Sequence, residues 1–373
     1  MAGCDHPTEI KAIRNVAAMA TGVIGGGLVV WAIVAFLMAA AGAPKTNSPL
    51  VGILLTVIFS TGSLILSIFF WLVAGDSATG FGFGGGWGRP LRIRGGGVTP
   101  RARRAHGWTR GQRPAANAIE RLDPEARALL RDMWLHDANK EWGSVPAFAH
   151  VAWQLVAVAA PPDLVQRALR SAQQEIDHTR RCFAMASAYA GEELGPSPME
   201  ELAAGGDALP KDRLAALGVI AEESLVDGAY VEDYNAELAA AALGDVEDAA
   251  ARETLECIVR DERQHAELAW DIVAFCIDQG GDAVRERLRR AWKERVPAEA
   301  PLPYGRAIAD RVARIDEEAL YVHGRVRPGH WPVVHRARVA VLSARLEALL
   351  AARPKALVSA RREARAPLPP AAS

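Results

Sequence analysis

Two glutamates each precede a histidine by three residues. The motifs are Glu175-Ile-Asp-His178 and Glu262-Arg-Gln-His265, and no other histidine in the chain has a glutamate at this spacing. On a helix, a spacing of three places a carboxylate and an imidazole on one face, so that both can bind a single metal ion. Oxygen-rich ligands with one imidazole per metal favour iron or manganese over copper or zinc.

Two further glutamates lie before the two predicted turns, each of which would connect one pair of helices. Glu141 lies 20 residues before Pro161-Pro162, and Glu223 lies 21 residues before Gly244. In antiparallel hairpins that rise about 1.5 Å per residue, these positions come to roughly the heights of the two Glu-x-x-His pairs. The pattern therefore brings together four carboxylates and two imidazoles, which are Glu141, Glu175, His178, Glu223, Glu262 and His265.

Two positions in this set leave alternatives open. Glu222 is the other carboxylate available on its helix, and we favour Glu223 because its helical face continues to Tyr230. Pro146 lies about one turn after Glu141 and removes a helical hydrogen bond. It therefore predicts that Glu141 stands on a kinked or separate turn.

The charge of this set also points to metal ions. Four buried carboxylates without compensating charge would be very costly, and two divalent ions would supply four positive charges. The alternative is that the glutamates lie on solvated helix faces. Apolar residues surround each of them in the sequence, which disfavours that alternative.

The elements that must position these side chains are helices, and the sequence predicts an all-α protein. Between residues 117 and 292, apolar residues recur every three or four positions, and alternating strand patterns are not evident. The expected helices span a lead-in at 123–133 and four long segments at 139–159, 163–190, 211–243 and 246–278. Short, long and short connections between the four long segments are typical of a four-helix bundle with one long crossover connection.

The motifs resemble those of the ferritin-like di-iron carboxylate proteins, which include bacterioferritin and the rubrerythrins. The resemblance covers about residues 120–290 and rests on four segments, 141–149, 175–178, 221–225 and 261–269. It implies that the six residues named above bind two iron ions, or manganese, with Glu175 and Glu262 as bridges. The implied activity is an oxidase or ferroxidase that uses O₂ or peroxide, with Fe(II) or a membrane-soluble molecule as substrate.

Two runs without charge stand near the N-terminus. The intervals from Arg14 to Lys45 and from Lys45 to Asp76 both exceed the roughly 20 residues that span a bilayer. They predict transmembrane helices at 18–42 and 50–74. A cleaved signal peptide is the alternative for the first run, but such a signal has an apolar region of only about 7–15 residues.

Arginines without acidic residues follow this hairpin up to about residue 119, whereas the loop between the two helices has only Lys45. The asymmetry predicts that both termini and the helical domain lie on the cytoplasmic side of the inner membrane. The expected organisation is a short N-terminus at 1–17, a transmembrane hairpin at 18–74, a flexible Gly/Arg-rich tether at 75–118 whose arginines contact lipid headgroups, a ferritin-like bundle at 119–292, and C-terminal helices with a basic tail at 293–373.

The C-terminal region is expected to contain amphipathic helices at about 304–322 and 333–352. Packing on the bundle, formation of a homodimer and binding to the inner leaflet are the alternatives for them.

Composition excludes several other classes of function. The 373 residues carry a formal net charge of −1, which does not favour a specific nucleic-acid partner. The four cysteines lack Cys-x-x-Cys spacing, which argues against a disulfide framework or a zinc ribbon. The alternative to an oxidase is a non-catalytic, membrane-anchored helical interaction module in which the metal is structural or absent.

Overall fold

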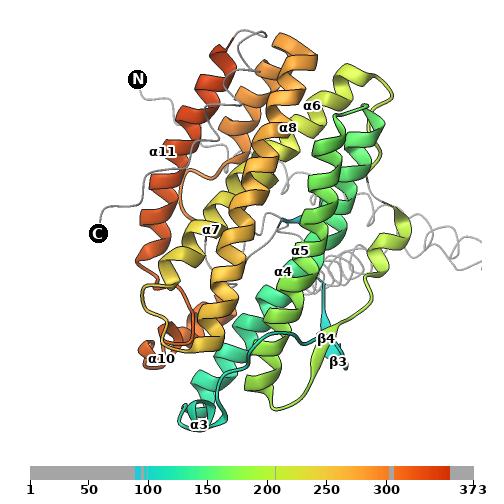
Figure 1. The fold of residues 1–373 in the computed structure, drawn as a ribbon. Coiled ribbons are helices and arrows are strands. Elements are labelled where there is room, and N and C mark those ends of the chain that lie inside the picture. Colours follow the sequence, from blue (N-terminus) through green and yellow to red (C-terminus); the bar gives the residue numbers. More distant parts are fainter. Residues whose placement is uncertain (1–88, 94–95, 99, 206, 302–305, 353–373) are drawn as a thin grey trace, which may run out of the picture. The chain divides into compact units, whose positions relative to one another are not determined.

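The computed structural model describes residues 89–93, 96–98, 100–205, 207–301 and 306–352, which all belong to one compact unit of the chain. This part of the protein is predominantly helical, as the sequence predicts (Figure 1). The predicted transmembrane helices 18–42 and 50–74 lie outside the described residues. Within the described ranges, no helix combines the length and the apolar character that crossing a bilayer requires.

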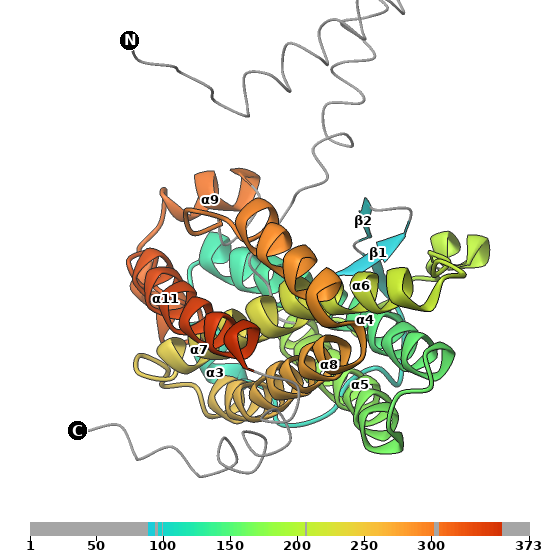
Figure 2. The same ribbon diagram turned by 90° about the horizontal axis from the view of Figure 1, so that it is seen from above.

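Four helical paths lie side by side around a common core (Figures 1 and 2). They are α4 (Pro124–Ala157), α5 (Pro162–Ala190), α6 (Arg213–Glu223) continued through η2 (Ser224–Tyr230) into α7 (Val231–Ala242), and α8 (Ala249–Arg295). Short turns join α4 to α5 and α7 to α8, whereas residues 191–212 form a long connection between the two pairs. The pairs contact each other through α5 and α8 and through α4 and α6.

Helix α4 merges the predicted lead-in with the first predicted long helix. The sequence predicts a break between residues 133 and 139, but Trp134, Asp137 and Ala138 are buried and the helix continues through them. Pro146 also lies inside α4, so Glu141 stands on the same continuous helix rather than on a separate turn. Burial of this segment outweighs Pro146 and the sequence pattern that predicts a break between residues 133 and 139, because tertiary packing contributes most of the stability of a protein helix.

The third path contains a π-helical segment, η2, where a regular helix is predicted. A π-helix has i→i+5 hydrogen bonds and is frequent at functional sites. All seven residues of η2 are buried. Gly228 faces α8 so closely that a Cβ atom there would lie 2.5 Å from the Cβ of Ala269. The register of this path is therefore adapted to its contact with α8.

Helix α8 is longer than the predicted segment 246–278. Its N-cap is Asp248, whose carboxylate accepts a hydrogen bond of 2.8 Å from the amide of Ala251. At Gly281, φ is +57°, which favours glycine, and the chain bends there before continuing to Arg295. Val284 is buried beyond this bend, so the extension contributes to the core.

The C-terminal region packs on the bundle. The predicted helix 304–322 is divided into α9 (Arg306–Val312) and α10 (Glu318–Tyr321), and α11 (His330–Ala351) follows. Helix α11 lies along α7, on the side of the bundle opposite to α5 (Figure 2). Its Arg338 donates hydrogen bonds of 2.6 and 2.9 Å to the carboxylate of Asp233 on α7. Among the alternatives for these helices, the structure therefore shows packing on the bundle.

Short strands occur where a flexible tether is predicted. β1 (Leu91–Ile93) pairs with β2 (Gly96–Val98), and β3 (Ala102–Arg104) pairs with β4 (Leu194–Pro196) of the long connection, both in antiparallel register. Arg92 donates hydrogen bonds of 2.8 and 2.7 Å to Asp227 of η2. This arginine therefore contacts the bundle.

Candidate metal centre

Six buried side chains converge at the centre of the bundle, and every helical path contributes one carboxylate. Helices α5 and α8 each add a histidine from their Glu-x-x-His motif. The six residues are at most 1% exposed, and they are Glu141, Glu175, His178, Glu232, Glu262 and His265.

These side chains form two overlapping groups of candidate ligands. In each group, one ligand atom from every residue lies within 4.8 Å of the others. Glu175 and Glu262 belong to both groups. The first group adds Glu141 and His178, and the second adds Glu232 and His265. The arrangement is therefore that of two adjacent sites sharing two carboxylates.

Both imidazoles direct Nδ1 at the carboxylates. Nδ1 of His178 lies 3.7 Å from Glu141, 3.5 Å from Glu175 and 3.7 Å from Glu262. Nδ1 of His265 lies 3.2 Å from Glu175 and 3.7 Å from Glu262. Edges of this length are what a metal ion about 2.0–2.2 Å from nitrogen and oxygen ligands would span.

The second ring nitrogen of each imidazole, Nε2, points away from the cluster and has a hydrogen-bond acceptor of its own. Nε2 of His178 lies 3.2 Å from Oδ2 of Asp261, and Nε2 of His265 lies 3.1 Å from Oε1 of Gln174. With these acceptors, Nε2 carries the proton in a neutral ring, and Nδ1 keeps a lone pair for a metal. The pattern of hydrogen bonds is therefore that of metal-binding histidines.

The inward-facing atoms have no hydrogen-bond donors to satisfy them. Among the described residues, no hydrogen bond of good geometry reaches either carboxylate oxygen of Glu141, Glu175, Glu232 or Glu262 or Nδ1 of either histidine, so the imidazole–carboxylate approaches of 3.2–3.7 Å are the contacts that these atoms make. Buried polar atoms are nearly always hydrogen-bonded, so a whole cluster without such partners needs another explanation. A pair of metal ions fits this donor set, because these carboxylates and imidazoles are buried together and each offers a ligand atom to at least one of the two groups.

Electrostatics lead to the same conclusion. Burial, together with the charge of Glu175, raises the pKa of Glu141 well above its usual value. Burial and the neighbouring Glu262 likewise raise the pKa of Glu232. The protein without metal must therefore hold protons at this site, whereas divalent cations would compensate the ionised carboxylates directly.

Glu223, which the sequence favours as the ligand from the third path, is not among the converging side chains. Its carboxylate accepts a hydrogen bond of 2.8 Å from Nε2 of Gln154. The rival Glu222 pairs instead with Arg287 at 2.6 Å and with Arg295 at 2.8 Å. Glu232 lies nine positions after Glu223 in the sequence, which corresponds to about 13 Å along a helix. Only one of these two glutamates can therefore reach the site.

The sequence can indicate Glu232 as the ligand from the third path, but only when the ends of the turn between α7 and α8 are known. Glu232 lies eleven residues before the end of its hairpin arm at Leu243, and Glu262 lies fourteen after Asp248. Glu223 lies twenty residues before Leu243. Comparing heights within this hairpin alone would therefore favour Glu232. Asp261 and Gln174 have no comparable signal, because only the packing of α5 on α8 brings them to the histidines.

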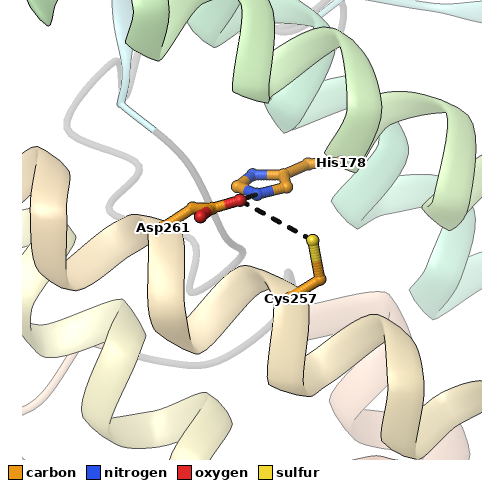
Figure 3. A group of neighbouring side chains, drawn as sticks. All are labelled: His178, Cys257 and Asp261. Atoms are coloured by element: carbon orange, nitrogen blue, oxygen red, sulfur yellow. Dashed lines mark hydrogen bonds and ion pairs between the residues drawn. The ribbon is translucent and has the colours of Figure 1, made fainter.

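A third group of ligand types adjoins the first site (Figure 3). Cys257 and Asp261 of α8 reach towards His178 of α5, with Sγ of Cys257 3.6 Å from Oδ2 of Asp261. Nη2 of Arg260 lies 3.3 Å from this sulfur and 3.0 Å from the same oxygen. The guanidinium of Arg260 therefore supplies the positive charge in this group. The role of Asp261 here is to hydrogen-bond Nε2 of His178.

A cavity of about 240 Å³ is linked to His265 of the second group through Arg89, which lines the cavity, and through Phe148. The ring centroids of Phe148 and His265 are 4.8 Å apart. The guanidinium carbon of Arg89 lies 5.7 Å from the centroid of the same Phe148 ring. Arg89 and Glu223 both line the cavity. Glu223 thus belongs to the surroundings of the candidate centre and not to its ligand set.

Comparisons of the whole chain with protein-family models, with curated proteins and with solved structures find no match.

Proposed function

We propose that the protein is a membrane-tethered oxidase, with a ferritin-like bundle that holds a dinuclear iron centre, or manganese in its place. The observation that carries the proposal is the cluster of buried carboxylate oxygens and imidazole nitrogens that lack hydrogen-bond partners among the described residues. The two overlapping groups of ligands favour two ions over one. When bound, iron would supply electrons for the reduction of O₂ or peroxide.

The side chains of the site would bind and orient the ions. Glu175 and Glu262 would bridge, because both belong to the two groups. Glu141 with His178, and Glu232 with His265, would each complete one half. Hydrogen bonds at Nε2 hold both imidazoles in a fixed orientation, and full burial keeps bulk water away from the centre.

The proposed location is the cytoplasmic face of the inner membrane, because the sequence places two long uncharged runs and an arginine-rich segment before the bundle. A membrane-soluble reductant or Fe(II) would then be the substrate. The charged cavity supports access to the centre, because Arg89 lines it and also lies over the ring of Phe148, which contacts His265.

The test is anaerobic addition of Fe(II) to the purified full chain in detergent, followed by exposure to O₂. We expect close to two bound iron ions per chain and O₂ consumption coupled to iron oxidation. Glu262→Ala should abolish the oxidation, because both ions lose a shared ligand and two-electron chemistry needs both ions.

Glu256→Ala, at an exposed position on the same helix, is the matched control and should retain both iron binding and oxidation. Binding of iron without any O₂ consumption would contradict the oxidase and favour a structural metal. Absence of bound iron or manganese would contradict the metal centre itself.

A further inference from the structure

The two halves of the proposed centre have the same kinds of direct ligands. Each half has one carboxylate of its own, one imidazole through Nδ1 and the two shared carboxylates of Glu175 and Glu262. All of these side chains are fully buried. Lys140 interacts electrostatically with the private carboxylates of both halves, Glu141 and Glu232, so it does not separate them. The direct ligands therefore give no reason for the halves to differ.

The partners of the two Nε2 atoms differ. His178 has the carboxylate of Asp261 at 3.2 Å, whereas His265 has the amide oxygen of Gln174 at 3.1 Å. A hydrogen bond to an ionised acceptor is stronger than one to a neutral acceptor. It draws the Nε2 proton away from the ring and makes Nδ1 a better electron donor to a metal, which raises metal affinity.

Arg260 reduces this effect but does not cancel it. Its guanidinium contacts Asp261 at 2.9 and 3.0 Å. The side chain of Arg260 is 64% exposed, so solvent screens its charge. Asp261 is 5% exposed and His178 is fully buried, so their mutual interaction is screened much less. The carboxylate therefore remains the dominant influence on the ring.

We infer that the two halves bind metal with different affinities, the His178 half holding the resident ion and the His265 half the exchangeable one. This inference rests on the proposed dinuclear centre. The exchangeable half is also the half linked to the cavity, since Phe148 lies against His265 and Arg89, which lines the cavity, lies over the same ring of Phe148. An ion that arrives as substrate or leaves as product would use that half.

The test is a titration of the metal-free full chain in detergent with Mn²⁺ alone, with free Mn²⁺ measured by electron paramagnetic resonance. We expect two separate binding steps. His265→Ala should remove the weaker step and keep the tight one, whereas His178→Ala should remove the tight step. Asp261→Asn should weaken the tight step by about 10- to 100-fold and bring the two affinities together.

Gln174→Glu provides the reverse change, because it gives His265 a carboxylate partner, and it should strengthen the weaker step. Glu256→Gln removes one exposed carboxylate from α8 and should leave both steps unchanged. A single class of two equal sites in the wild-type chain would overturn the inference while leaving the dinuclear centre intact. Loss of the tight step in His265→Ala would also overturn it. Absence of any Mn²⁺ or Fe²⁺ binding would instead refute the proposed centre.

Discussion

At the scale of single residues, the third helical path offers two glutamates in different environments. Glu232 faces the cluster, whereas Glu223 accepts a hydrogen bond from Gln154 beside the cavity. We expect Glu232→Ala to reduce bound metal from the two ions of the proposed centre to about one, because only the His265 half loses a private ligand. Glu223→Ala should retain both ions. Elemental analysis of the two purified variants measures the difference, and a loss of metal in Glu223→Ala alone would contradict the assignment.

At the scale of elements, η2 and α8 approach each other at Gly228. A Cβ atom there would lie 2.5 Å from the Cβ of Ala269 and 2.7 Å from Nη1 of Arg89. Gly228→Ala must therefore separate the π-helical segment from α8, and overpacking of this kind costs about 1–3 kcal/mol. Because Glu232 follows η2 directly, metal binding should weaken as well. Thermal denaturation with and without metal measures both effects.

Gly329→Ala is the matched control for this substitution. The position at the start of α11 has open space around it and a φ of −65°. Its melting temperature should stay the same or rise slightly, since alanine restricts the unfolded chain. Equal melting temperatures for both glycine variants would show that the contact between η2 and α8 is loose.

At the scale of the whole molecule, a buried ion pair connects the C-terminal region to α4. Arg325 lies 2.7 Å from Asp137, with side chains 1% and 2% exposed, and its guanidinium stacks 3.9 Å from the ring of Trp134. Arg325→Ala leaves a buried carboxylate without its charge partner, which typically costs about 3–5 kcal/mol. Urea denaturation should show this loss in the free energy of unfolding.

An exposed ion pair provides the comparison. Arg104 pairs with Glu192 where the side chains are 82% and 40% exposed, and Arg104→Ala should cost less than about 1 kcal/mol. If both arginine variants unfold at the same urea concentration, the C-terminal region contributes little to the stability of the bundle.

The sequence by itself determined the helical character of the described region and five of the six converging side chains. Residues three apart on a helix share a face whatever surrounds them, so the Glu-x-x-His pairs on α5 and α8 follow from local geometry. Glu141 could be placed because the short turn after α4 links its height to that of Glu175.

Only the tertiary structure decided the sixth side chain and the partners around the site. The choice of Glu232 over Glu223 depends on where α7 ends and α8 begins, because these ends set the heights of both glutamates relative to Glu262. The continuity of α4 depends on burial of the segment around Trp134. The difference between Asp261 and Gln174 arises where α5 packs on α8, and contacts between residues more than eighty positions apart have no local signature in the sequence.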